Sequence, residues 1–127
     1  MATLAAAILR EDSDRWERIF IDSGLESMQH AVGGLIEFVS IDDERISLVA
    51  NEEGKINGMA ATAIWVNQDG EVVDALCGPL LALGGVDADG YTTGLTDEAF
   101  LALQGHLKVI PIERRAAITE QVRAFFG

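Results

Sequence analysis

Short apolar runs alternate with polar stretches along the first part of the chain. Two of these runs, residues 3–9 and 16–21, flank the polar stretch Arg10–Arg15. Apolar runs of this length between polar turns are typical of β-strands, and the bulky residues of the second run strengthen that interpretation. The first run is rich in alanine and would also suit a helix, but the pattern favours two strands joined by a polar connection.

A helix is predicted next, because the segment Ser23–Glu26 has the form of a capping box. In this motif the Ser23 hydroxyl accepts from the third backbone N–H, and the Glu26 carboxylate reaches back to the serine N–H. An apolar stripe follows at helical spacing: Leu25, Met28 and Val32. The pair Gly33-Gly34 suits the end of this helix, because glycine adopts the left-handed conformation without steric cost.

The middle of the chain contains further short apolar runs. They cover Leu35–Ile41, Ile46–Ala50, Ala61–Val66, Glu71–Leu76 and Leu80–Leu83. The gaps Asp42–Arg45 and Asn67–Gly70 are polar turns of hairpin length. Each gap therefore predicts that its two flanking runs pair as antiparallel strands.

A glycine-rich loop, Gly84–Gly94, precedes the helical part of the chain. Thr96 is placed to cap a helix whose first turn is acidic, and Pro111 suits the first turn of a last helix. The last helix has an apolar stripe formed by Ile118, Val122 and Phe125. The default use of this stripe is the core, and a homo-oligomer interface or a docking face are the alternatives.

The order of these elements predicts an α+β fold, in which a mainly antiparallel, hairpin-rich sheet packs with two to three helices. The 127 residues fit a single domain, because no internal repeat and no long linker divides them. Residues 107–127 are expected to form a helical extension of that domain.

Charge and cysteine content exclude several classes of function. Nine basic and 21 acidic residues give a net charge of −12, which argues against direct nucleic-acid binding. The single cysteine, Cys77, excludes an internal disulfide and a zinc site with two thiolates. No apolar stretch is long enough to cross a membrane, and the apolar N-terminus lacks the basic start of a secretory signal. We therefore expect a soluble, cytoplasmic protein.

The segment Asn51–Lys55, with the sequence NEEGK, is the first candidate binding site. It does not fit a phosphate-binding loop, because Val49 stands where the first glycine is required and Ile56 follows the lysine. Its amide and carboxylate oxygens are ligands that hard metal ions prefer, but adjacent side chains of an extended chain point in opposite directions. A solvated turn is the default interpretation, and a ligand- or partner-binding loop is the alternative.

The acidic positions Asp87 and Asp89 of the glycine-rich loop are the second candidate site. Neither this loop nor the turn at Gly70 has the spacing of a calcium-binding loop. The histidines are His30 and His106, and no sequence motif of a serine hydrolase, a zinc protease or a dinucleotide-binding enzyme occurs. We therefore expect no catalytic residue, no metal site and no cofactor.

Several short motifs occur in an order that resembles a small domain of unknown function from phages, plasmids and actinobacterial or other Gram-positive genomes. The matching motifs are Val32-Gly33-Gly34, Asn51–Lys55, Ala61-Thr62 and Gly78-Pro79, within residues 16–100. The chain departs from the pattern at Met59-Ala60, where the family usually has a proline and an asparagine. The resemblance implies a phage or mobile-element origin and brings no known reaction or cofactor.

These observations favour a non-enzymatic accessory protein of a phage or mobile element that binds a host protein. In its strongest form it is an anti-defence inhibitor whose carboxylates mimic nucleic acid on a basic host surface. The alternative is a protein that binds or sequesters a small molecule such as a nucleotide signal, with backbone N–H groups of two loops as donors. An enzyme is the third hypothesis. The expected binding residues are Asn51, Glu52, Glu53, Gly54, Lys55, Asp87 and Asp89.

Overall fold

The computed structural model describes residues 3–126, with side chains as far as Ala124. Its elements follow in the order β1 (Thr3–Leu9), β2 (Glu17–Asp22), α1 (Leu25–Val32), β3 (Ile36–Ile41), β4 (Ile46–Asn51), β5 (Ala61–Val66), β6 (Val72–Cys77), β7 (Leu80–Gly84), α2 (Asp97–His106), β8 (Leu107–Val109) and α3 (Ile112–Phe126). In this described part the strands form two antiparallel sheets accompanied by three helices, which confirms the predicted α+β class. All the predicted strands occur, and their ends differ from the prediction by no more than one residue.

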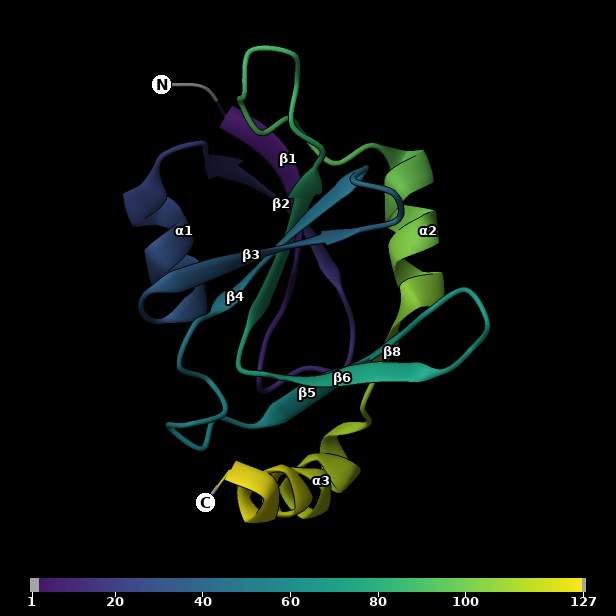
Figure 1. Ribbon diagram of the computed structural model, residues 1–127. Coiled ribbons are helices and arrows are strands. Elements are labelled where there is room, and N and C mark those ends of the chain that lie inside the picture. Colours follow the sequence, from purple (N-terminus) through teal and green to yellow (C-terminus); the bar gives the residue numbers. More distant parts are fainter. Residues whose placement is uncertain (1–2, 127) are drawn as a thin grey trace.

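The larger sheet has the strand order β2-β1-β7-β4-β3, and each strand is antiparallel to its neighbours (Figure 1). Its register places Leu48 opposite Ala82 and Val49 opposite Leu81. Because successive side chains of a strand point to opposite faces, the first pair faces the smaller sheet and the second pair faces α1. Both faces are therefore covered, which explains why β4 and β7 are apolar almost throughout.

Helix α1 packs on the outer face of the larger sheet through the buried side chains of Met28 and Val32. The helix begins one residue later than the capping box predicts, because Gly24 is the N-cap and no side chain caps the helix. The predicted Ser23 cap is therefore wrong: Ser23 lies one position too early for its hydroxyl to meet the free N–H groups. The helix ends as predicted at Gly33, whose φ of 79° is left-handed.

The smaller sheet has the strand order β6-β5-β8 and packs against the inner face of the larger one. The main hydrophobic cluster lies between the two sheets and is closed on one side by α2. Its leucines are at most 5% exposed and include Leu9, Leu48, Leu76, Leu80, Leu103 and Leu107. Because burying one such side chain contributes about 1.5–3 kcal/mol, this cluster is the main source of stability.

Helix α2 is fixed at its start by a cap and by contacts with β2. Thr96 is the N-cap as predicted, and its hydroxyl accepts from the Ala99 N–H at 3.0 Å. Arg18 of β2 forms an ion pair of 3.0 Å with Asp97, and its guanidinium lies 4.8 Å from the centroid of the Phe100 ring. One arginine thus ties an edge strand of the larger sheet to the helix that closes the core.

Strand β8 corrects the prediction for residues 107–127, which gave only a helical extension. Leu107–Val109 continues directly from α2 and pairs with β5, so α3 begins only at Ile112. Three residues are too few for a recognisable strand pattern, and Leu107 also continues the apolar spacing of α2 from Leu103. Pairing with β5 and burial of Leu107 in the main core decide that the chain becomes extended here.

Helix α3 packs on the outer face of the smaller sheet. Ile118 and Val122 pack against a cluster that includes Ala61 and Ile110, so the apolar stripe of this helix serves the core, its default interpretation. The remaining member of the predicted stripe, Phe125, has a side chain outside the described part. Ile118 and Val122 therefore face the protein's own smaller sheet.

Two polar side chains also hold α3. Arg115 is 3% exposed and donates to the backbone carbonyls of Arg10 and Glu11, each at 3.0 Å. The Thr119 hydroxyl accepts from the Ala61 N–H at 2.8 Å. Helix α3 is thereby bonded both to the β1–β2 loop and to β5.

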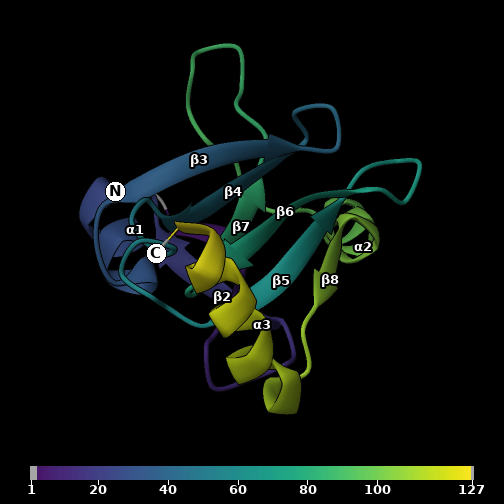
Figure 2. The same cartoon turned by 60° about the horizontal axis from the view of Figure 1, so that its bottom comes forward.

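The two views of the ribbon show how these layers are arranged. In Figure 1, α1 lies beside the larger sheet, and α3 lies beyond the smaller sheet on the side away from the larger one. Figure 2 brings α3 forward, and in both views the loop between β7 and α2 projects at the end opposite α3. We call residues 85–96, which form this connection, the projecting loop.

Candidate functional site

Asn51, the first residue of the NEEGK segment, is buried and has a structural role. Its Nδ2 donates to the Val32 carbonyl at 3.1 Å, and its Oδ1 accepts from the Glu53 N–H at 2.8 Å. The residue is 7% exposed. The amide therefore joins the end of α1 to the loop that follows β4.

Gly54 lies where the same loop passes close to the turn between β6 and β7. A Cβ at this position would lie 2.8 Å from the Cys77 carbonyl oxygen, which is closer than real Cβ contacts. The Gly54 N–H donates to the Asn51 carbonyl, and the Gly54 carbonyl accepts from the Met59 N–H. Close packing alone thus explains why glycine occupies position 54, and a bound phosphate is not needed to explain it.

Lys55 and Glu52 line a cavity of about 300 Å³, which we call the loop cavity. Lys55 forms an ion pair with Asp74 of β6, and Glu37 of β3 also lines the cavity. The other lining residues are Ala50, Asn51, Ile56, Leu76 and Cys77. Because three carboxylates and one ammonium group line the cavity, the local charge is negative and suits a cation better than a phosphate.

The thiol of Cys77 is part of a buried environment next to this cavity. Burial raises the pKa of the thiol; the Lys55 ammonium acts in the opposite direction, and the Asp74 and Glu11 carboxylates raise the pKa further. A thiol that stays protonated at neutral pH is a poor nucleophile. Cys77 therefore behaves as a small apolar side chain, as its neighbours in the sequence predict.

The backbone N–H groups of both candidate loops are largely used inside the protein. In the loop after β4, those that donate to backbone carbonyls belong to Glu52, Gly54, Asn57, Gly58 and Met59. From the end of β7 through the projecting loop, those that do so belong to Gly84, Asp87, Gly90, Thr93 and Leu95. A phosphate cradle needs several free N–H groups that converge on the anion. Several of the donors that the nucleotide hypothesis assigns to these loops are therefore engaged inside the protein.

Asp87 and Asp89 lie in the projecting loop and do not line the loop cavity. The Asp87 carboxylate accepts from the N–H groups of Asp89 and Tyr91, at 2.9 and 3.0 Å. This arrangement stabilises the turn, while the Asp89 side chain is exposed. The predicted binding residues that share the loop cavity are Asn51, Glu52 and Lys55. The seven predicted residues therefore do not form one site.

A shallow groove lies between α1 and the projecting loop, and sequence reasoning missed it. Its volume is about 440 Å³, and its walls are formed by Leu4, Ser23, Leu25, Met28, Phe38 and Gly90–Thr92. Three of these side chains are large and exposed: Leu25 to 58%, Phe38 to 54% and Tyr91 to 72%. We call this feature the α1 groove. It exists because α1 has eight residues and does not reach over Phe38, which shares the outer face of the larger sheet with Ile36.

The titratable side chains of residues 3–124 are the remaining candidates for chemistry. No three of their His, Cys, Asp or Glu side chains are grouped so that they could hold a metal ion. His106 Nε2 lies 3.4 Å from Asp42 Oδ1, whereas His30 is exposed on α1. No helix of the described part is long and apolar enough to cross a membrane.

Most of this chain matches one known protein family. Residues 5–108 match a family described as a domain of unknown function, DUF3846. The matched segment includes most of both sheets and the helices α1 and α2, and α3 lies beyond it. No curated protein and no solved structure matches the chain. Because the match spans well over half of the residues, the protein belongs to the DUF3846 family.

Proposed function

We propose that the protein is a non-enzymatic binding module that docks on a basic, partly apolar segment of a host protein. The observation that carries this proposal is the α1 groove, where Leu25, Phe38 and Tyr91 are each more than half exposed. Exposed apolar side chains that gather around a concave surface are typical of interaction sites. Aromatic residues are also enriched among the anchors of protein interfaces.

The charges around the α1 groove support a basic partner. Asp22 and Glu26 are sequence neighbours of its α1 wall, and Asp87 and Asp89 belong to the loop on its other side. Among the described residues, no lysine or arginine lines the groove. A partner that places apolar side chains in the groove and Lys or Arg side chains at its rim would therefore match both its shape and its charge.

The biological setting that we propose is an accessory role for a phage or mobile element in the cytoplasm of its host. The net charge of −12 supports an inhibitor that presents carboxylates to a basic, nucleic-acid-binding surface of a host defence protein. Short motifs that resemble a domain found in phages and plasmids support the same setting.

The groove can be tested with a lysine–leucine model peptide as the probe. We expect this peptide to bind the protein and to shift backbone NMR signals of α1, β3 and the projecting loop. Phe38→Ala and Tyr91→Ala are expected to weaken binding about tenfold or more, because anchor side chains at interfaces contribute upward of about 2 kcal/mol each. Leu101→Ala is the matched control, since Leu101 is 70% exposed on α2 but does not line the groove.

The charge component is tested separately with Asp89→Asn. The Asp89 side chain is exposed, so this substitution removes one rim charge and leaves the Asp87 hydrogen bonds in place. We expect slower association and a weaker dependence of affinity on salt. Peptide binding that is unaffected by Phe38→Ala and Tyr91→Ala, or NMR shifts confined to other surfaces, would refute the proposal.

Binding of a small molecule at the loop cavity is a second candidate function. It is supported by one observation, that Asn51, Glu52 and Lys55 line the same cavity. The excess of carboxylates there favours an organic cation over a nucleotide. Spermidine should raise the melting temperature of the protein more than ATP does, and Asp74→Asn should reduce that rise. A larger shift with ATP would contradict this assignment.

A further inference from the structure

A further hollow, of about 440 Å³, lies between the β1–β2 loop, the end of α2 and β8. Its walls include Trp16 just before β2, Gln104 of α2 and Leu107 of β8. Its charged groups are Asp14, Arg15 and Lys108. We call it the Trp16 hollow. Unlike the loop cavity, it has more cationic than anionic groups, although the protein as a whole is strongly acidic.

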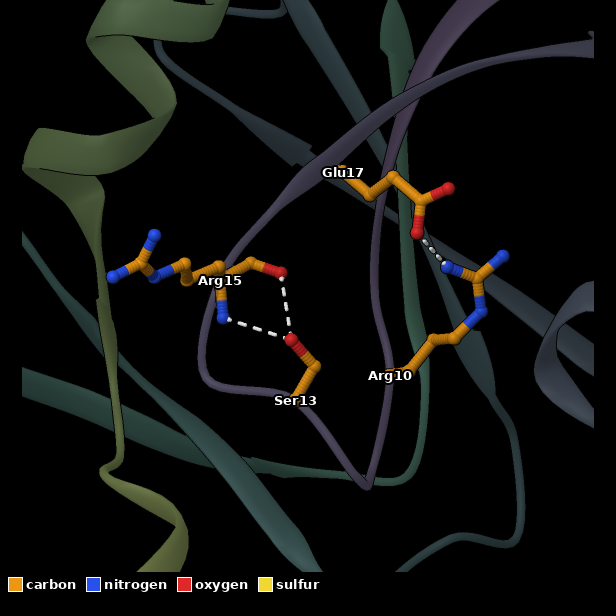
Figure 3. Close-up of polar contacts among 4 residues, drawn as sticks. All are labelled: Arg10, Ser13, Arg15 and Glu17. Atoms are coloured by element: carbon orange, nitrogen blue, oxygen red, sulfur yellow. Dashed lines mark hydrogen bonds and ion pairs between the residues drawn. The ribbon is translucent and has the colours of Figure 1, made fainter.

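The β1–β2 loop holds the backbone of Arg15. The Ser13 hydroxyl accepts from the Arg15 N–H at 3.2 Å and lies 3.4 Å from the Arg15 carbonyl, to which it donates. The hairpin is closed by an ion pair between Arg10 and Glu17. Figure 3 shows that the Arg15 side chain extends away from this pair, toward the chain that leads from α2 into β8. Arg15 and Lys108 thus approach the hollow from two different elements.

The cations of the Trp16 hollow differ from most others in the protein. Arg10, Arg18, Lys55 and Arg123 each form an ion pair with a carboxylate, and Arg115 is buried against backbone carbonyls. Within residues 3–124, neither Arg15 nor Lys108 has an ion-pair partner, although 21 acidic residues are present in the chain. Two unneutralised cations therefore line one hollow.

The aromatic wall adds a second recognition element. Trp16 is partly buried and packs against the main core, and it also lines the hollow. Its Nε1–H is buried without an acceptor in the described part of the protein. The indole therefore has a hydrogen-bond donor that a ligand oxygen could satisfy. Indole surfaces pack well against planar rings, and the Gln104 amide can both donate and accept.

We propose that the Trp16 hollow binds a small aromatic anion, which carries a planar ring and a phosphate or carboxylate group. The anionic group would be bound by the Arg15 guanidinium and the Lys108 ammonium, and the ring would pack against Trp16 and Leu107. Charge-assisted hydrogen bonds to Arg and Lys are among the strongest that proteins make to phosphate and carboxylate. This site is separate from the α1 groove and does not depend on the function proposed there.

The test is isothermal titration calorimetry of the whole chain at low salt with four probes. AMP combines a ring with a phosphate and salicylate combines a ring with a carboxylate, whereas adenosine and inorganic phosphate each offer one of the two features. We expect AMP or salicylate to bind at least tenfold more tightly than adenosine and phosphate. Arg15→Gln and Lys108→Gln should each weaken that binding about tenfold, as expected for the loss of one hydrogen bond to a charged group.

Arg114→Gln is the matched control. Arg114 is exposed on α3 and has no ion pair among the described residues, so its removal changes the net charge equally. It is expected to leave the affinity unchanged within twofold. A loss equal to that of Arg15→Gln would show that general electrostatics, not this hollow, binds the anion. Failure of both AMP and salicylate to bind, or phosphate binding as tightly as they do, would overturn the proposal.

A spectroscopic measurement tests the aromatic wall without removing it. The chain contains two tryptophans, Trp16 and Trp65, so Trp65→Phe leaves Trp16 as the single indole fluorophore. We expect the better-bound aromatic anion to change the fluorescence of this variant in proportion to occupancy. Binding by calorimetry with no change in Trp16 fluorescence would place the ligand elsewhere and contradict the proposal.

Discussion

Gly54 and Asn51 determine the path of the loop after β4 for different reasons. Gly54 leaves room for the Cys77 carbonyl, whereas Asn51 uses both ends of its amide to join two other backbone segments. Both residues are therefore required by the fold itself, whether or not they contact a ligand. Only some residues of the NEEGK segment therefore remain candidates for ligand binding. Glu52 and Lys55, whose side chains line the loop cavity, are among them.

Gly54→Ala is expected to lower the free energy of unfolding by about 1–3 kcal/mol, because the new Cβ must displace a backbone carbonyl. Gly105→Ala in α2 is the control. Nothing lies within 4 Å of a Cβ at Gly105, and alanine favours the helix, so we expect a gain of up to about 1 kcal/mol. Urea unfolding followed by circular dichroism measures both. A Gly54→Ala protein as stable as the wild type would contradict the close contact.

The raised pKa of Cys77 makes the free energy of unfolding depend on pH, and the direction of the shift sets the sign of this dependence. The folded protein holds the thiol proton more tightly than the unfolded chain does, so stability is fully present below the ordinary cysteine pKa. This contribution to stability is lost as the pH rises from the ordinary cysteine pKa through the raised pKa of the folded state. We therefore expect a fall in the free energy of unfolding at alkaline pH that is smaller in Cys77→Ala. Urea titrations across a pH series measure it, and identical slopes for the two proteins would contradict it.

Sequence reasoning identified the turn in the NEEGK segment but not the roles of its residues. Asn51 bonds to Val32, and Gly54 packs against Cys77, and both partners are distant in the sequence. Such contacts depend on how α1 and β6 are placed, which periodicity does not reveal. The α1 groove was missed for the same reason, since Phe38 looks like any apolar residue of a strand until the length of α1 is known.

At the scale of elements, α3 is attached by one arginine as well as by its apolar stripe. The Arg115 guanidinium donates to carbonyls of the β1–β2 loop and, through Nε, to the Ile110 carbonyl at 2.8 Å. Burial lowers the pKa of this group, and the Asp14, Glu11 and Asp12 carboxylates oppose that effect. The acidic β1–β2 loop thus favours the charged form of the buried side chain.

Arg115→Lys is expected to destabilise the protein by about 2–4 kcal/mol, because one ammonium cannot reproduce a fork of hydrogen bonds in a buried site. Hydrogen exchange should show faster opening of α3 amides than of β4 and β7 amides. Arg114→Lys, at an exposed neighbouring position, should change stability by no more than about 0.5 kcal/mol. Equal effects of the two substitutions would mean that the Arg115 contacts do not hold the helix.

The elements that were predicted well are those with strong local signals. Polar turns marked the hairpins, and Thr96 and Gly33 marked helix ends, because caps act within a few residues. The start of α1 was misplaced because Ser23 and Gly24 are both acceptable caps by local rules. Strand β8 could not be predicted, because its three residues become extended only through pairing with β5.

At the scale of the whole molecule, the dominant property is the excess of negative charge. A net charge of −12 on 127 residues produces repulsion that is strongest in the compact state. The projecting loop and the β1–β2 loop each add carboxylates at the surface. The folded state is therefore more sensitive to ionic strength than that of a neutral domain of the same size.

Sodium chloride is expected to raise the midpoint of thermal unfolding between low and physiological ionic strength, because the Debye length shortens from about 30 to about 8 Å over that range. A variant that combines Glu53→Gln and Asp89→Asn, both at exposed positions, should show a smaller rise. Differential scanning calorimetry at several salt concentrations measures the effect. A midpoint that falls with added salt would mean that attractive ion pairs outweigh the repulsion.

The elements of the smaller sheet are synthesised in an order that leaves β8 and α3 until after β5 and β6. The β5–β6 hairpin is synthesised with apolar side chains on both faces, such as Ala63 and Leu76 on one and Ala61 and Ile64 on the other. The strand that pairs with its free edge and the helix that covers its outer face are translated afterwards. A nascent sheet with an unpaired edge and an uncovered apolar face is prone to aggregate. Chaperones that bind unfolded chains prevent such aggregation. The unfinished smaller sheet is therefore exposed to aggregation until β8 and α3 have been synthesised.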